Sequence, residues 1–188
     1  MSKIEQWKIN RNIKRYLKES NSKNLAKLTY ILRNDTEIQD IVLKDELVDK
    51  LIARLKSSQY NIQTYDSGES RGMIDLLGSL GNPKAADLLV NRFVFGMDRD
   101  GENLIYAIKK MGKYALPPIL ESLPKVSLQN VYYPEYVRAL KILDIVRDSS
   151  AEQPLIDFIQ RCVEGNYPRA AEKGAWALVR CGGLKSLK

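Results

Sequence analysis

The chain contains no histidine and only two cysteines, Cys162 and Cys181. Without an imidazole there can be no Ser-His-Asp triad, no Cys-His dyad and no histidine-based zinc or iron site. Two cysteines cannot supply a four-thiolate zinc site or an iron–sulfur centre on their own. The sequence therefore argues against most nucleophilic and metal catalysis, and we expect no cofactor and no metal.

Long apolar runs are also missing. No stretch approaches the ~18 residues that a membrane-spanning helix needs, and the N-terminus lacks the apolar core of a signal peptide. Apolar residues make up 44% and charged residues 28% of the chain, as in ordinary soluble proteins. So few cysteines are typical of a reducing compartment. We therefore expect a cytoplasmic protein that does not insert into membranes.

The formal net charge of +7 belongs to one end of the chain. Residues 1–33 hold nine lysines and arginines against two glutamates, which accounts for the whole excess. The other residues carry equal numbers of basic and acidic groups. Positive charge is thus a property of the N-terminal segment, and it does not mark the whole chain as a nucleic-acid-binding protein.

An internal repeat runs through the rest of the sequence. LGSLGNPKAADLL (77–89) aligns without a gap with IKKMGKYALPPIL (108–120), and a frame with spacings of 31, 35 and 35 residues is anchored on Leu80, Met111, Val146 and Cys181. Counting the anchors and the positions three, four, six and seven residues before them, 19 of 20 are apolar, where composition predicts about 9. Glycine, a helix-stop signal, follows Leu80, Met111 and Cys181, whereas Arg147 follows Val146.

Each unit is predicted to form two helices joined by a tight turn. The first helix carries the apolar stripe, and the second begins near Pro83, near 114–118 or near 150–154. Asn82 is expected to cap one second helix, and Ser150 with Gln153 to form a capping box at another. Trp176 falls inside a first helix, so it is expected to pack in the core or between repeats.

This arrangement resembles HEAT repeats, and LLGSLGNPKAADLL resembles most closely the subtype named after phycobilisome lyases. The resemblance covers residues 69–183 and is specific for architecture alone, so no lyase chemistry is carried over. It implies an all-α, right-handed α-solenoid of about four and a half helical hairpins. A basic amphipathic helix (1–20) is expected before a solenoid (21–188), with units at roughly 22–57, 69–95, 101–124, 134–164 and, in part, 168–188.

The N-terminal helix is predicted over residues 3–18. On a helical wheel its apolar residues, Ile9, Ile13, Tyr16 and Leu17, gather on one side. The opposite, basic face holds Lys3, Trp7, Lys8, Arg11, Lys14, Arg15 and Lys18. Three interpretations stay open: a capping helix with solvated charges, a face that binds nucleic-acid phosphates, or a face that docks on an acidic protein or membrane surface.

In HEAT-type stacks the second helices line a concave surface, which solenoids use to bind partners. The polar residues expected there are Lys84, Asp87, Asn91, Glu121, Lys125, Asp157 and Arg161. Two pairs among them, Glu121–Lys125 and Asp157–Arg161, are spaced for ion pairs four residues apart on a helix. The competing interpretation is a solvated face on which such ion pairs are weak and no partner binds.

The sequence thus predicts a non-catalytic binding module, adaptor or scaffold that holds an unidentified protein on its concave surface. The alternative is a nucleic-acid-binding protein that uses the basic N-terminal helix. DNA glycosylases built from HEAT-like repeats are the enzymatic exception, and they work with Trp and Asp residues in a concave cleft. The sequence shows no matching pair.

Overall fold

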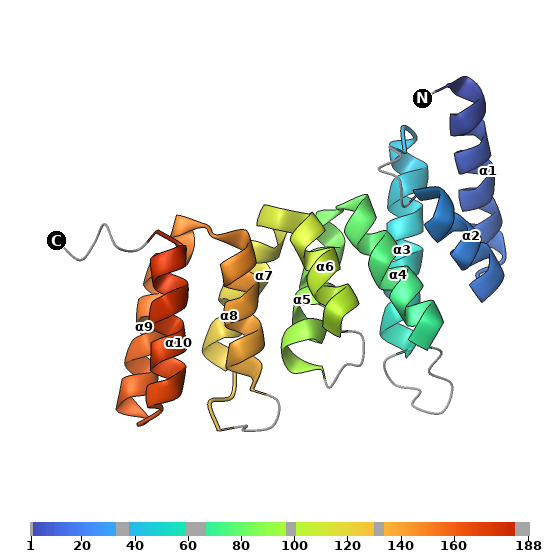
Figure 1. Ribbon diagram of the computed structural model, residues 1–188. Helices are drawn as coiled ribbons and strands as arrows, with labels where there is room; N and C mark the ends of the chain where they lie inside the picture. The colour runs from blue at the N-terminus through green and yellow to red at the C-terminus, as the bar shows by residue number, and fades with distance from the viewer. Residues whose placement is uncertain (1, 33–37, 59–66, 97–100, 130–133, 183–188) are drawn as a thin grey trace. The chain divides into compact units, whose positions relative to one another are not determined.

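The computed structural model describes residues 2–32, 38–58, 67–96, 101–129 and 134–182, and within these ranges all regular secondary structure is helical (Figure 1). The prediction of an all-α protein is confirmed. The chain divides into two compact units. Unit 1 comprises Met1–Ala85 and Arg99–Lys110, and unit 2 comprises Ala86–Asp98 and Met111–Lys188.

Unit 1 begins with four α-helices in sequence order. They are α1 (Lys3–Lys18), α2 (Ser22–Leu32), α3 (Ile41–Ser58) and α4 (Ser67–Leu80), followed by the 3₁₀ turn η2 (Pro83–Ala85) and later by α6 (Gly101–Met111). Helix α1 packs on α2 and α3, and α4 packs on the same two helices. Helices α2 and α3 lie in the range expected for the first unit, roughly 22–57. Asp40 Oδ1 accepts from the Leu43 N–H at 3.0 Å and so caps the start of α3.

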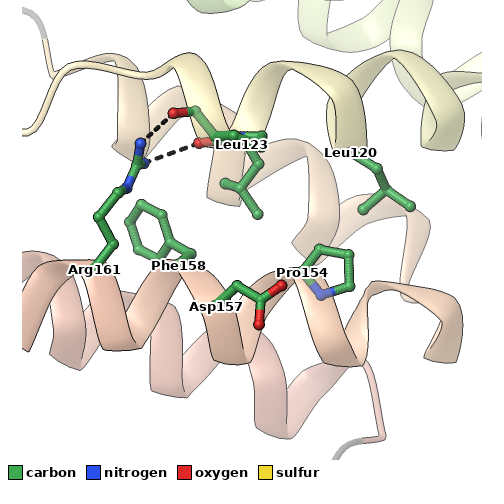
Figure 2. A pocket seen from close by; sticks show the side chains of 7 residues that line it. Leu120, Leu123, Pro154, Asp157, Phe158 and Arg161 are labelled. Carbon is green, nitrogen blue, oxygen red and sulfur yellow. Dashed lines mark hydrogen bonds between the residues drawn. The ribbon is translucent and has the colours of Figure 1, made fainter.

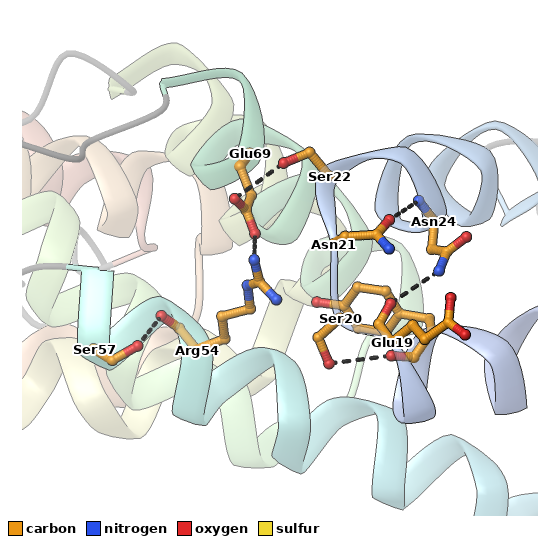
Figure 3. A network of polar contacts seen from close by, with 9 residues as sticks. Glu19, Ser20, Asn21, Ser22, Asn24, Arg54, Ser57 and Glu69 are labelled. Carbon is orange, nitrogen blue, oxygen red and sulfur yellow. Dashed lines mark hydrogen bonds and ion pairs between the residues drawn. The ribbon is translucent and has the colours of Figure 1, made fainter.

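A polar network ties three helices of unit 1 together (Figure 3). Glu69, in the first turn of α4, forms an ion pair with Arg54 of α3. Its other carboxylate oxygen accepts a hydrogen bond from the Ser22 hydroxyl of α2 at 3.3 Å. One carboxylate therefore joins α2, α3 and α4, and it lies at the N-terminal end of α4, where the helix dipole favours a negative charge.

Unit 2 contains the remaining helices. They are α5 (Ala86–Phe95), η3 (Gly112–Ala115), α7 (Leu116–Ser122), η4 (Leu123–Lys125), α8 (Glu135–Val146), η5 (Ser149–Ala151), α9 (Glu152–Glu164) and α10 (Pro168–Arg180). Helices α5, α7 and α8 pack on one another, and α10 packs on α8 and α9. The contact of α10 with α9 is close, because Gly174 lies against the side chains of Ile159 and Phe158, where a Cβ atom would be 2.9 Å from both.

The repeat frame marks buried positions, as predicted. Every frame position is buried except Ile105, Val146 and Leu178, which are half-buried, and Ala175, which is exposed. The prediction for Trp176 is wrong, because this side chain is 59% exposed. Trp176 lies five residues before its anchor, outside the apolar stripe of α10.

The residue after each anchor adopts the left-handed backbone conformation. The φ angles are +58° at Gly81, +55° at Gly112, +91° at Gly182 and +51° at Arg147. Arginine thus accepts at the third turn the conformation that glycine adopts freely at the others. The helix-stop signal read from the sequence therefore operates in all four copies, including the one without glycine.

The caps of the second helices agree with the prediction in one case and differ in the other. Asn82 Oδ1 accepts from the Lys84 N–H at 3.0 Å, so Asn82 caps η2. The predicted capping box of Ser150 and Gln153 is wrong. Asp148 accepts both the N–H (2.9 Å) and the hydroxyl (2.7 Å) of Ser150, because a carboxylate at this place caps η5 directly. These two hydrogen bonds lower the pKa of Asp148.

Substituting Gly78→Ala should destabilise unit 1. An added Cβ would lie 2.6 Å from Ala107 Cα and 2.7 Å from Ala107 Cβ, so the backbones of α4 and α6 would have to separate. We expect a loss of about 1–3 kcal/mol in the free energy of unfolding, measured in urea. Gly101→Ala is the matched control, because nothing lies within 4 Å of its added Cβ. Equal stability of the two variants would contradict the close approach of the helices.

The left-handed turns give a second prediction. An added Cβ at Gly112 meets nothing within 4 Å, so Gly112→Ala should cost only the backbone term, about 1 kcal/mol. The same preference for glycine holds at position 147, so Arg147→Gly should be more stable than Arg147→Ala by about 1 kcal/mol. Chemical denaturation measures both differences. An alanine variant as stable as the glycine variant at position 147 would contradict the assigned conformation.

Candidate functional site

A cleft of about 260 Å³ lies in unit 2 between the α7–η4 segment and α9 (Figure 2). Its lining residues are Leu120, Leu123, Pro124, Pro154, Asp157, Phe158 and Arg161. The four residues contributed by α9 follow the spacing i, i+3, i+4, i+7, so they lie on one face of that helix. The cleft is thus a groove between α9 and the α7–η4 segment that precedes it in unit 2.

Arg161 closes one end of this cleft. Its guanidinium donates to the Leu123 carbonyl at 3.0 Å and to the Pro124 carbonyl (Figure 2). The same group lies 5.6 Å from the ring centroid of Phe158, in a cation–π arrangement. Carbonyls at a helix C-terminal end lack intrahelical partners, and a cation stabilises them. Arg161 therefore holds α9 against η4 and is not free to bind a partner through these N–H groups.

The predicted ion pair between Asp157 and Arg161 is wrong. Asp157 is exposed and its Oδ1 accepts from Gln153 Nε2 at 2.8 Å, while Arg161 turns to the carbonyls of η4. The Glu121–Lys125 pair is also wrong. Helix α7 ends at Ser122, so Lys125 lies in η4, and within the described part of the chain neither residue forms an ion pair.

The other predicted concave residues make contacts within the protein. In unit 1, Lys84 Nζ bonds to the two carboxylate oxygens of Asp49 at 3.2 and 3.1 Å. In unit 2, Asn91 Nδ2 donates to Asp87 at 2.7 Å, and Asn91 Oδ1 accepts from the Ser122 hydroxyl at 3.3 Å. Of the predicted set, only Asp157 and Arg161 line the cleft. The apolar lining was not predicted from the sequence, although Pro154 and Phe158 share a helical spacing with Asp157 and Arg161.

The basic face of α1 forms a second candidate surface, in unit 1. All of its residues are exposed, whereas on the opposite side Ile9, Ile13 and Tyr16 are buried and Leu17 is half-buried, so the helix divides into two faces as predicted. A capping box between Ser2 and Glu5 starts the helix. Hydrogen bonds from the Ser2 backbone and hydroxyl lower the pKa of Glu5, so this acid stays charged at the helix N-terminus.

The cations of this face have no anionic partner in the part of the chain that the structure describes. None of Lys3, Lys8, Lys14, Arg15 and Lys18 forms an ion pair with a described residue. The Arg11 guanidinium lies 5.2 Å from the ring centroid of Trp7. The face therefore presents positive charges together with an exposed aromatic ring.

The remaining reactive groups give no sign of a reactive centre. Cys162 and Cys181 are buried free thiols and form no disulfide with each other. Burial raises the pKa of both thiols, so neither is held as a nucleophilic thiolate. Among the described residues, no cluster of three or more Cys, Asp or Glu side chains could hold a metal ion. Within the same residues, no helix combines the length and apolar character required to cross a membrane.

No family model, no curated protein and no solved structure matches this chain.

A double-mutant cycle tests the role of Arg161. Arg161→Gln removes a charge-assisted contact to two carbonyls and should lower the free energy of unfolding by about 1–2 kcal/mol. Asp157→Asn should change it little, and the coupling energy between the two substitutions should be within about 0.5 kcal/mol of zero. Urea denaturation of the four proteins measures this. A coupling energy well above ~0.5 kcal/mol would show that Asp157 and Arg161 do form an ion pair.

Proposed function

We propose that the protein is a non-catalytic binding module, an adaptor or scaffold, and that its helical hairpins form a HEAT-like α-solenoid. The buried frame positions and the left-handed residue after each anchor support the repeat architecture. In such a solenoid, α5, α7 and α9 line the concave surface. The buried free thiols fit a cytoplasmic location, where cysteines stay reduced.

The observation that carries the proposal is the cleft between α7 and α9. Drug-sized ligands and cofactors occupy pockets of about 300–1,000 Å³, so a cleft of about 260 Å³ suits one or two side chains of a protein partner better. Leu120, Leu123 and Phe158 offer apolar contacts. With Arg161 engaged by carbonyls, Asp157 is the lining side chain that can accept from a partner cation. We infer that the cleft takes a large apolar side chain next to a lysine or arginine.

Panning a random-peptide display library on the immobilised protein tests this proposal. The enriched peptides should carry a large apolar residue beside a basic one. Their affinity should fall at least about tenfold for Leu120→Asp, which places a charge in the apolar wall, and less for Asp157→Asn, which removes only the anion.

Val163→Asp is the matched control, because Val163 is an exposed apolar residue of α9 that does not line the cleft. Circular dichroism establishes that each variant is folded. Peptides that bind the Leu120→Asp variant as tightly as the original protein would show that the cleft is not the binding site.

Nucleic-acid binding through α1 is the second candidate function. The specific observation in its favour is the row of exposed cations without a described anionic partner, on a helix whose apolar side is already buried. Lysines and arginines that are not engaged within the protein release counterions when they contact phosphates, which drives such binding. A shift of labelled RNA in a native gel at low salt, lost in the presence of high salt, tests this candidate.

A further inference from the structure

The basic face of α1 combines a row of cations with the exposed aromatic ring of Trp7. Around the helix axis, the positions from Lys3 through Lys18 to Lys8 span an arc of about 140°. Within this arc every residue is basic except Ile4 and Trp7. We propose that this face binds single-stranded nucleic acid, with phosphates against the cations and one base stacked on Trp7. The inference rests on the second candidate function and specifies its ligand.

The orientation of the helix fixes which residues a ligand can reach. Ile13 and Tyr16 are fully buried, and α1 packs on both α2 and α3, so the helix cannot turn its basic face inward. The only acid on the helix, Glu5, lies off the arc and is held by Ser2. The face therefore keeps a positive potential along its ~24 Å length, which complements a polyanion.

The ring of Trp7 provides a surface on which a base can stack, which charged groups alone do not provide. Its side chain is 58% exposed, and Arg11 covers one side of the ring at 5.2 Å. Because the ring is exposed and a guanidinium holds it in place, Trp7 offers a preorganised surface for stacking. Stacking of bases on aromatic rings is the common mode of single-strand binding, and it tolerates any base sequence.

The same observations disfavour a duplex or a membrane as the ligand. Bases in a duplex are already stacked on one another, so Trp7 would have no free base to contact. A helix that lies in a membrane interface buries a broad apolar side in lipid. The apolar side of α1 is buried in the protein, and only Trp7 and Ile4 (67% exposed) remain on the exposed arc.

The experiment uses the two tryptophans of the chain. In the full-length Trp176→Phe variant, Trp7 is the only tryptophan, so its fluorescence reports the site alone. This protein is titrated at low salt with four probes: oligouridylate, an RNA duplex of the same length, inorganic polyphosphate, and vesicles containing phosphatidylserine. Oligouridylate should bind most tightly and should quench Trp7, because its unpaired bases can stack on the ring.

Two variants separate the stacking from the charge, and fluorescence anisotropy of labelled oligouridylate follows both. Trp7→Ala should lower the affinity about fivefold or more while leaving the salt dependence unchanged. Neutralising four cations to glutamine should reduce the slope of log affinity against log salt by about 3; these are Lys8, Lys14, Arg15 and Lys18. The matched control neutralises four exposed lysines outside α1, namely Lys50, Lys109, Lys141 and Lys173.

The possible outcomes are distinct. Quenching by oligouridylate, together with losses in both α1 variants and none in the control, supports the proposal. Equal binding of duplex, polyphosphate and oligouridylate without quenching overturns the stacked single strand but leaves a phosphate-binding face. Tighter binding of the vesicles overturns nucleic acid in favour of a lipid surface. No binding of any probe at low salt contradicts the nucleic-acid function itself.

Discussion

The structure depends on burying the apolar stripe of each first helix, and that burial requires each helix to stop at a defined residue. Three glycines and Arg147 end these helices in the left-handed conformation. A helix that continued past its anchor would carry polar residues such as Asn82 and Asp148 onward along the same axis. Because it stops, those residues cap the next turn instead. The turn at Arg147 and the cap by Asp148 thus set where η5 and α9 begin, and α9 forms one wall of the cleft.

The repeat frame and the division of α1 were predictable because both follow from burial. Burying a leucine or isoleucine side chain is worth about 1.5–3 kcal/mol, so evenly spaced apolar residues such as Leu77 and Ile108 settle which face turns inward. The exposure of Trp176 was predictable from the same frame. The equivalent residues in the other units are Asp75, Tyr106 and Lys141, none of which is buried.

The ion pairs were not predictable from spacing, because the energies at stake are small. A pair four residues apart on a helix contributes about 0.2–0.5 kcal/mol. A hydrogen bond from a charged group to an otherwise unpaired carbonyl contributes about 1.5–3 kcal/mol. Because η4 places the carbonyls of Leu123 and Pro124 near α9, Arg161 donates hydrogen bonds to them and forms no ion pair with Asp157. The sequence shows the candidate partners on the same helix, but the competing carbonyls come from a segment 37 and 38 residues away.

The contact of Arg161 with the η4 carbonyls also affects the chemistry of the cleft. With Arg161 held by carbonyls and stacked on Phe158, its charge stabilises the junction of η4 and α9. Asp157 retains an oxygen beside Pro154 and Phe158 that can accept a partner's hydrogen bond. The cleft is therefore apolar with a negative border, whereas the exposed face of α1 carries cations around Ile4 and Trp7, so we expect the proposed partners of the two surfaces to carry opposite charges.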